Sequence, residues 1–300
     1  MYSHKMTLDQ LAAFNRANGM KVQQIGGTWW AEVRPFFFRP LFPFTEIDNA
    51  GLRYPKKSLL GGVLHAVSPS FSANTSINLF VYEDPQGYSL QSLGETHRRR
   101  TRKGMKHFTV RRILDLEEFI AEAYEIYLSF YSRTNYQYKK ERLRIQHFTA
   151  WSHTLFSFPH IVVLGAYHAG KLSAIDVSYR VEDVVIDDIF FSDTASQQLQ
   201  VTDVMLHALR EAAASSDAKY VFKGFPSGKP SLDASKILRG CKILSKPAFF
   251  KFNPVALFAA KHLMKESYAK LLTMTSPSTP YDTAVEFKPA GTRTESDLAA

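Results

Sequence analysis

The sequence predicts an α/β protein with a mixed, mostly antiparallel sheet flanked by helices. Three strand patterns follow one another through tight turns between residues 161 and 193. Tight turns of this kind join antiparallel neighbours. A helical pattern at 202–215 then separates the third strand from another strand pattern at 219–225. Because parallel neighbours need such a crossover, one parallel pair is expected within the sheet.

Length and composition are those of a globular chain. The 300 residues suit one large or two smaller domains, and a hydrophobic content of 45% can fill a substantial core. The single cysteine, Cys241, excludes an intrachain disulfide framework and suits a reducing compartment. The N-terminal residues lack the apolar stretch of a signal peptide, and no uncharged run reaches the roughly 18 residues of a membrane span. We therefore expect a cytoplasmic location, and a disordered tail over 275–300, which is rich in Ser, Thr and Pro.

The first ninety residues give few clear patterns. Residues 8–17 suit a short helix, and SINLFVYE (76–83) alternates as a strand does. Between them, TWWAEVRPFFFRPLFPFTEI contains three prolines, at 35, 40 and 43. Repeated prolines are not tolerated in a central strand, so this segment is expected to be a packed edge segment or loop.

From residue 95 the order of elements is clearer. A basic helix over 95–106 precedes a strand, HFTVRRIL (107–114). Asp115, followed three residues later by Glu118, is typical of a helix start, and apolar residues then recur at helical spacing up to Tyr131. A second helix is expected from Tyr138 to His153.

The three strands of the meander are IVVLGAYH (161–168), LSAIDVSYRV (172–181) and VVIDDIFFSD (184–193). After the helix that starts at Thr202 or Asp203 come the strand KYVFKGF (219–225), a short helix around 234–238 and the strand region CKILSKPAFFKF (241–252). A final amphipathic helix is expected after Pro254, with one apolar stripe formed by Leu257, Ala260, Met264, Tyr268 and Leu271.

Residues 96–112, THRRRTRKGMKHFTVRR, contain eight cations and no acidic residue: Arg98, Arg99, Arg100, Arg102, Lys103, Lys106, Arg111 and Arg112. The net charge is +9, so the rest of the chain carries only 9 − 8 = +1. A cluster this local indicates an anionic partner, either nucleic acid, the phosphates of a bound donor, or a membrane face. A solvated basic helix is the simpler alternative.

The order of elements resembles the GNAT acyltransferase fold and, more closely, the Fem-type (FemAB-like) aminoacyl and acyl transferases. Four stretches carry this resemblance: the basic helix that leads into a strand, the hairpin LGAYHAGKLSAIDVSYRVEDVV, the glycine-loop segment KYVFKGFPSGKPSLDASKILRGCKI, and the Asn-Pro element FFKFNPVALF. The match covers roughly residues 90–265. It implies a GNAT/Fem-like transferase domain over 91–274 and a shortened, partial GNAT-like lobe over 1–90.

One departure concerns the donor. Acetyl-CoA enzymes of this fold usually hold the pyrophosphate on a glycine-rich loop at a helix start. Here SDTASQQLQVTD (192–203) contains no glycine. Fem-type enzymes also lack the loop, so the resemblance implies either aminoacyl-tRNA or an acyl thioester, such as an acyl-CoA, as co-substrate. An acidic acyl carrier protein would also suit the basic helix. No bound cofactor is expected.

The predicted reaction is direct transfer of an acyl or aminoacyl group to an amine, which needs a base but no covalent nucleophile. The G-x-S-x-G pattern of Ser hydrolases is absent. Asp187 and Asp188 are candidate bases that must point to opposite faces of one strand, and Asp176 is a third candidate. A carboxylate among apolar neighbours has a raised pKa. A solvent-facing carboxylate or a buried ion pair is the alternative.

Binding residues follow from the same reading. Arg98, Arg99, Arg102 and Lys103 on the basic helix, with Lys229, Lys236 and Arg239 around the 224–231 loop, are the candidate donor-binding residues. That loop fails the G-x-x-x-x-G-K-[ST] pattern, so nucleotide hydrolysis is rejected. Tyr127 and Tyr131 are candidate acceptor-binding residues, with core packing as the alternative. The histidines lack metal-ligand spacing, and no metal site is expected.

Two rival functions stay open. The first is a non-catalytic RNA-binding protein on the same fold. The second is a peripheral membrane protein, for which the helix at 255–272 places Lys261, Lys265 and Lys270 beside an apolar stripe.

Overall fold

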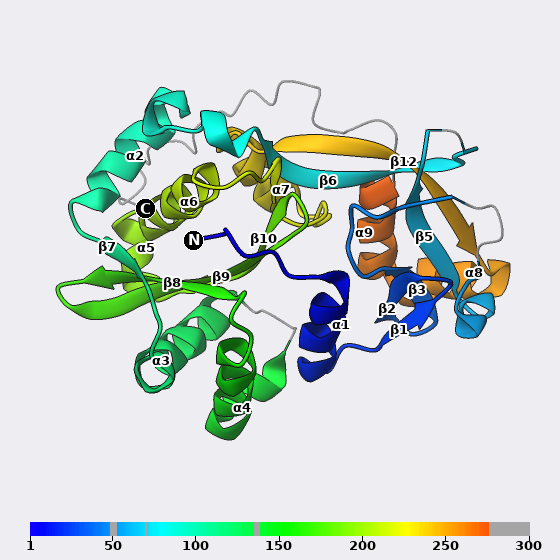
Figure 1. The fold of residues 1–300 in the computed structure, drawn as a ribbon, viewed down its shortest axis with the longest axis horizontal. Helices are drawn as coiled ribbons and strands as arrows, with labels where there is room; N and C mark the ends of the chain where they lie inside the picture. The colour runs from blue at the N-terminus through cyan, green and yellow to red at the C-terminus, as the bar shows by residue number, and fades with distance from the viewer. Residues whose placement is uncertain (49–52, 70, 135–138, 276–300) are drawn as a thin grey trace, which may run out of the picture.

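A computed structural model describes residues 1–48, 53–69, 71–134 and 139–275. Its strands form one sheet in the order β1-β2-β3-β5-β12-β6-β11-β10-β9-β8-β7, with β4 paired to β5 (Figure 1). The predicted class, a mixed and mostly antiparallel sheet flanked by helices, is confirmed. The strands are β1 (Val22–Ile25), β2 (Thr28–Arg34), β3 (Phe37–Pro40), β4 (Glu46–Ile47), β5 (Gly62–Val67), β6 (Thr75–Glu83), β7 (Thr109–Arg112), β8 (Val162–His168), β9 (Lys171–Val181), β10 (Val184–Ser192), β11 (Tyr220–Phe222) and β12 (Lys242–Phe252).

Helices cover both faces of the half that contains the meander. In Figure 1, α3 and α4 lie on one side of β8 and β9, and α6 lies on the other with α2 beside it. The helices are α1 (Leu8–Ala17), α2 (Glu95–Met105), α3 (Leu116–Thr134), α4 (Ile145–Phe156), α5 (Thr194–Gln198), α6 (Val201–Ala214), α7 (Pro230–Leu238), α8 (Pro254–Leu263) and α9 (Lys265–Thr275), with short 3₁₀ turns that include η1 (Lys56–Leu59) and η4 (Lys140–Leu143).

The predicted meander is confirmed. Strands β8, β9 and β10 pair antiparallel, and β11 adds to β10 in parallel after α6. The start of α3 is also as predicted, because the Glu118 N–H donates to Asp115 Oδ1 at 2.8 Å. These elements were predictable since each depends on local periodicity and caps.

The N-terminal half was less predictable. The proline-containing segment forms β2 and β3 in the outer part of the sheet, with Pro35 in the turn between them and Pro40 at the end of β3. Strands β1 and β5 had no clear signal. Strand β12 lies between β5 and β6, antiparallel to both, so the last strand of the described residues completes the N-terminal half.

Three predicted boundaries were wrong. The helix expected from Tyr138 begins at Ile145 after η4, and Tyr138 itself lies outside the described residues. Helix α7 begins earlier than expected, at Pro230, where proline suits a first helical turn. The final helix is two helices, because Met264 leaves the helical conformation with φ −125° and ψ 51°. The expected tail lies, from residue 276, outside the described residues.

The core has two main layers, one on each face of the sheet. On the α3 and α4 side, Phe119 and Phe148 stack with ring centroids 5.8 Å apart, and Tyr127 meets the edge of Phe191 at 5.4 Å. On the α6 side, Val204 and other apolar residues of the helix pack on the sheet. The N-terminal segment joins both layers, since Met6 belongs to the first and Tyr2 to the second.

Helix α2 packs closely on the start of α6. A Cβ atom on Gly104 would lie 2.4 Å from Val204 Cγ2 and 3.1 Å from the Gln200 carbonyl oxygen. Only glycine therefore permits this approach, and it fixes the basic helix against the segment 199–204.

Gly104→Ala should lower the free energy of unfolding by about 1–3 kcal/mol, because the added methyl group forces α2 away from α6. The loss should appear although alanine favours a helix interior by roughly 1 kcal/mol over glycine. Urea denaturation would measure it. Gly94→Ala, at a position with no atom within 4 Å of the added Cβ, is the matched control. A more stable Gly104→Ala variant would contradict the packing.

Candidate active site at the parting of β10 and β11

The parallel strands β10 and β11 pair over three residues and then part. The last pair is Ile186 with Phe222, after which β10 continues to Ser192. The segment that follows β11 instead continues along β6, because the Lys223 N–H donates to the Phe80 carbonyl at 2.8 Å. Ligands of open α/β sheets bind outside the carboxyl ends of parallel strands. The parting therefore marks a candidate site.

A β-bulge lies on β10 at this point. Asp187 pairs with Ser178 of β9, and the next pair is Ile189 with Val177, so Asp188 has no partner in the register. A bulge re-aims side chains and is common beside active sites. Here it leaves Asp188 outside the pairing with β9, directly after Asp187.

The first carboxylate, Asp187, faces the α6 side and forms an ion pair with Lys223. Both side chains are largely buried, at 4% and 19% exposed. Burial lowers the pKa of Lys223 to about 8, while the nearby Asp176 opposes that shift. Lys223 is therefore protonated at neutral pH, but it loses this proton more easily than a surface lysine does.

Asp176 lies two residues from Ser178 on the same side of β9. It is 2% exposed, and the Ser178 hydroxyl donates to its Oδ1 at 3.0 Å. Burial raises the pKa of Asp176 to about 6, against the opposing effect of Lys223. The hydroxyl of Ser178 also hydrogen bonds to the Tyr2 hydroxyl at 2.7 Å. The N-terminal segment thus closes this buried polar cluster.

Asp188 has different neighbours. It is exposed, but protein surrounds it on several sides, and this partial removal from bulk water raises the pKa of its carboxyl group to about 6. The cations Arg142 and Lys139 of the η4 region act in the opposite direction. The two adjacent aspartates therefore face opposite sides of the sheet, as the sequence predicted. Asp188 combines access with a raised pKa.

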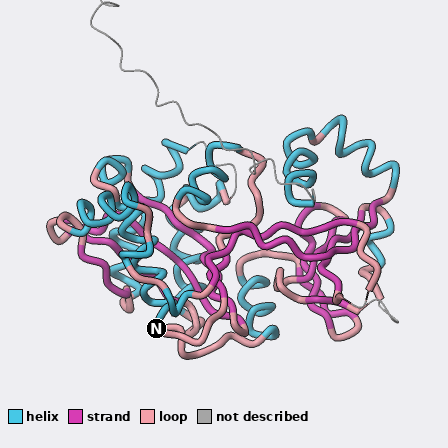
Figure 2. The backbone as a smooth tube through the Cα atoms, turned by 90° about the horizontal axis from the view of Figure 1, so that it is seen from above, coloured by secondary structure: helices cyan, strands magenta, loops and turns pink. Residues whose placement is uncertain are grey.

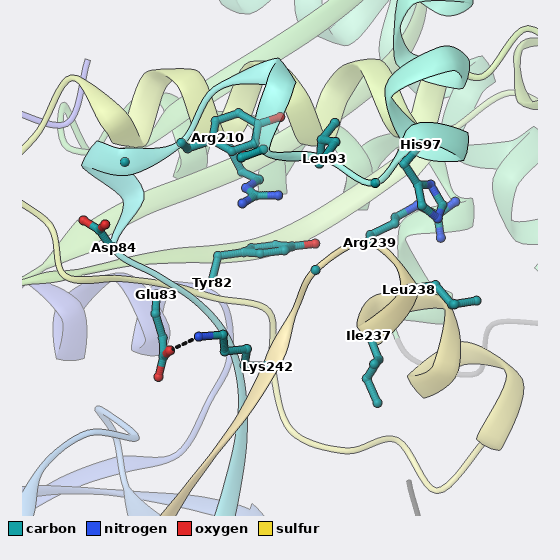
Figure 3. Close-up of a pocket in the computed structure, with 15 residues that line it drawn as sticks. Tyr82, Glu83, Asp84, Leu93, His97, Arg210, Ile237, Leu238, Arg239 and Lys242 are labelled. Carbon is teal, nitrogen blue, oxygen red and sulfur yellow. Dashed lines mark hydrogen bonds and ion pairs between the residues drawn. The ribbon is translucent and has the colours of Figure 1, made fainter. Parts of the chain in front are cut away.

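A polar pocket of about 450 Å³ lies between the start of α2 and the end of α7 (Figure 3). The guanidinium of Arg210 lies between two aromatic rings in its wall, 4.1 Å from the Tyr82 centroid and 3.8 Å from that of Tyr88. Asp203 of α6 connects two other residues that line the pocket. It accepts hydrogen bonds from Arg239 Nε at 3.0 Å and from His97 Nδ1 at 3.2 Å. The pocket is thus lined by cations and aromatic rings, and also by Glu83, which pairs with Lys242, and Asp84.

The predicted donor-binding cations fall into two groups. Lys236 and Arg239 lie near Lys223, and Lys236 Nζ donates to the Lys223 carbonyl at 3.0 Å. Arg239 already pairs with Asp203. Lys229 is exposed at the start of α7. On α2, Arg98 is half-buried, whereas Arg99, Arg102 and Lys103 are exposed.

The predicted acceptor residues lie away from these groups. Tyr127 is 2% exposed in the aromatic core, and its hydroxyl donates to the Lys139 carbonyl at 3.2 Å. Tyr131 is half-buried beside it, with ring centroids 6.0 Å apart. Core packing, the alternative that the sequence left open, describes Tyr127 in the structure. An acceptor contact by Tyr131 stays a prediction.

The sequence alone did not identify Lys223, Arg142 or Arg210 as site residues. Lys223 had a usable signal, a lysine between the apolar strand and the glycine of KYVFKGF. Arg142 and Arg210 had none, because each meets partners far away in the sequence. Cys241 is buried, and burial raises the pKa of its thiol to about 12, which does not suit a nucleophile.

Two further surveys cover the described residues. No group of three or more His, Cys, Asp or Glu side chains there is arranged to hold a metal ion. None of the helices in the same part of the chain is long and apolar enough to span a membrane.

No protein-family model and no curated protein matches this sequence. Solved structures do match. The C-terminal domain (DUF2156) of a putative lysylphosphatidylglycerol synthetase from Agrobacterium fabrum is similar with a TM-score of 0.58 and 12% identity, over 93% of this chain and 95% of that one. FemX is similar with a TM-score of 0.56 and 9% identity, over 84% and 92% of the two chains. L-PGS from Bacillus licheniformis gives 0.51 and 8%, over 91% and 98%.

At sequence identities this low, structural similarity shows a shared fold and nothing more. It confirms the resemblance to the Fem-type fold, and it extends over the N-terminal half as well as the meander, because it covers most of the chain.

Asp176→Asn should stabilise the protein more at pH 7 than at pH 4.5. The native pKa of Asp176 is raised to about 6, so between its unfolded value and pH 6 the native state binds more protons than the unfolded state. Stability of the unaltered protein therefore falls as pH rises through this window. Asparagine does not titrate, so the difference between the two proteins should grow by about 1–3 kcal/mol.

Urea denaturation at several pH values would test this. Asp217→Asn is the control, because hydrogen bonds from Arg180 and Lys5 hold the pKa of Asp217 below its usual value. Its loss of stability should stay constant between pH 4.5 and 7, because Asp217 is ionised in both the native and the unfolded states over this range. A difference for Asp176→Asn that does not vary between pH 4.5 and 7 would contradict the raised pKa.

Proposed function

We propose that this chain is an acyltransferase that moves an acyl or aminoacyl group from an activated donor to an amine at the parting of β10 and β11. One observation carries the proposal: Asp176, Asp187, Asp188 and Lys223 gather where the two parallel strands part. The similar structures of FemX, of the C-terminal domain of a putative lysylphosphatidylglycerol synthetase and of L-PGS support it by analogy of fold.

In this reaction Asp188 accepts a proton from the acceptor ammonium. The nitrogen lone pair then attacks the donor carbonyl carbon, a C–N bond forms, and the carbonyl oxygen becomes an oxyanion. Arg142 and Lys139, the cations that act on Asp188 from the same face of the sheet, would stabilise that negative charge. Collapse breaks the bond to the leaving oxygen or sulfur, and the attacking nitrogen gives its remaining excess proton to this leaving atom. Asp188 then releases the first proton to solvent. Asp188 suits the role of base because it is accessible and its pKa is about 6.

The donor we favour is aminoacyl-tRNA. Gly104 of α2 lies against the carbonyls of Leu199 and Gln200, so α2 covers the glycine-free segment where other enzymes of this fold hold pyrophosphate. The exposed cations of α2 suit a phosphodiester backbone, and the polar pocket beside the start of α2 suits an anionic or planar group. An acyl-CoA or an acidic acyl carrier protein is the second choice. An aminoacyl-tRNA donor places the activity in the cytoplasm.

A thermal-shift screen would identify the donor. Total aminoacyl-tRNA at 100 times its Kd should stabilise the fold by roughly 2.7 kcal/mol, and less at high salt. Stabilisation by an acyl-CoA with none by tRNA would overturn the tRNA donor.

Replacing Arg99, Arg100, Arg102 and Lys103 together with Gln should weaken tRNA binding. It should also reduce the slope of log K against log salt by about 0.7–0.9 for each phosphate that these side chains neutralise. Filter binding at several salt concentrations would measure this. Lys56→Gln with Lys57→Gln, two exposed cations of η1, is the matched control and should keep the slope. An unchanged slope in the α2 variant would remove α2 from the donor site.

With the donor identified, Asp188→Asn should slow transfer by about 10²–10⁴-fold, because the amine loses its base. Single-turnover transfer of a labelled acyl group would measure it, with donor binding checked separately. The Asp187→Asn variant should instead lose stability, since Lys223 would be left buried without its partner. Unaltered transfer by both variants, with tRNA binding intact, would remove both aspartates as bases. Absence of transfer by the unaltered protein, with tRNA bound, would favour the non-catalytic RNA-binding protein, which the exposed cations of α2 also suit.

A further inference from the structure

Helix α8, PVALFAAKHL, is apolar, yet the described part of the chain buries none of its residues. Val255, Phe258 and Leu263 are 78%, 66% and 83% exposed. Isolated exposed apolar residues are ordinary, but a contiguous group of this size usually marks an interaction site.

The turn η1 extends this apolar surface. Leu59 and Leu60 are 70% and 61% exposed. Asn253, just before α8, holds the two segments together: its Nδ2 donates to the Leu59 carbonyl at 3.0 Å, and its backbone N–H donates to the Gly61 carbonyl at 2.6 Å. We refer to the exposed residues of η1, Leu60 and α8 as the α8–η1 face.

The charges around this face are mostly positive, with exposed Glu266 after Lys265 as an acidic neighbour. Residues 53–61 and 253–265 contain Arg53, Lys56, Lys57, Lys261 and Lys265 and no acidic residue. The lysines are exposed. Apolar side chains rimmed by lysines match the hydrocarbon and the anionic headgroups of a bilayer surface.

An apolar groove of about 470 Å³ opens beside the face. Leu60, Leu263 and Met264 line it at the surface, and Phe225 lines it further in, two residues after Lys223. An apolar space of ligand size thus lies between helix α8 and the rest of the protein.

We propose that the α8–η1 face docks on an anionic lipid bilayer and that hydrocarbon from this bilayer enters the groove. The face lies at the opposite end of the molecule from α2 (Figure 1), and Figure 2 shows the same separation from above. The basic helix therefore stays free for a soluble partner while the protein is docked. The proposal does not depend on the transfer reaction.

Co-sedimentation of the full chain with vesicles tests the docking. Binding is expected to vesicles of phosphatidylcholine with phosphatidylglycerol and to be much weaker with phosphatidylcholine alone. Phe258→Glu with Leu263→Glu should weaken binding at least about tenfold, since two inserting side chains become anionic. Leu114→Glu with Leu232→Glu is the matched control, because these residues are 74% and 49% exposed outside the face. It should bind like the unaltered protein.

Light scattering on the same proteins tests whether a second copy of the chain occupies the α8–η1 face instead. A dimer that Phe258→Glu with Leu263→Glu separates, without vesicle binding by the unaltered protein, would show a second copy on the face and overturn the proposal. Monomers that bind no vesicles would overturn it as well. So would binding that is lost in the α2 variant and kept in the Phe258→Glu, Leu263→Glu variant.

Met264→Trp tests the groove. Lipids brominated on their acyl chains should quench the added fluorescence, measured against the unaltered protein, and iodide in the aqueous phase should lose access once vesicles are present. Quenching by iodide that persists with vesicles would contradict entry of hydrocarbon beside Met264.

Discussion

The pairing of β12 with both β5 and β6 is the constraint on which the rest of the structure depends. It joins the end of the described chain to the N-terminal half and makes one sheet of what would otherwise be two. Because β12 occupies one side of β6, β11 takes the other side, next to β10. After three residue pairs between β10 and β11, the segment that follows β11 continues along β6 and separates from β10. The candidate site is thus a consequence of the sheet order.

Burial determines the chemistry at this point. An ion pair between Asp187 and Lys223, with Asp176 close by, costs free energy to bury unless each group is paired or hydrogen-bonded. The result is a lysine with a lowered pKa and two aspartates with raised pKa values on the two faces of the sheet. Opposite shifts in neighbouring groups are typical of sites that move protons.

The surface divides into regions of different character. At one end, α2 presents cations above the polar pocket. At the other end, α8 presents apolar side chains with a lysine rim. The cluster around Lys223 is linked to both pockets, since Phe225, two residues later, lines the apolar groove and Arg239, which acts on the pKa of Lys223, lines the polar pocket. This arrangement suits a protein that brings together a polar donor and a membrane surface.

The sequence by itself determined the elements with local signals. Periodicity and caps predicted α3, the meander and the crossover to β11, and adjacency on a strand placed Asp187 and Asp188 on opposite faces. The basic helix was equally local. Only the tertiary structure decided the place of β12, the bulge at Asp188, the break at Met264 and the partners of Lys223, Arg142 and Arg210. Each of these depends on contacts between residues far apart in the chain, and no local pattern encodes such contacts.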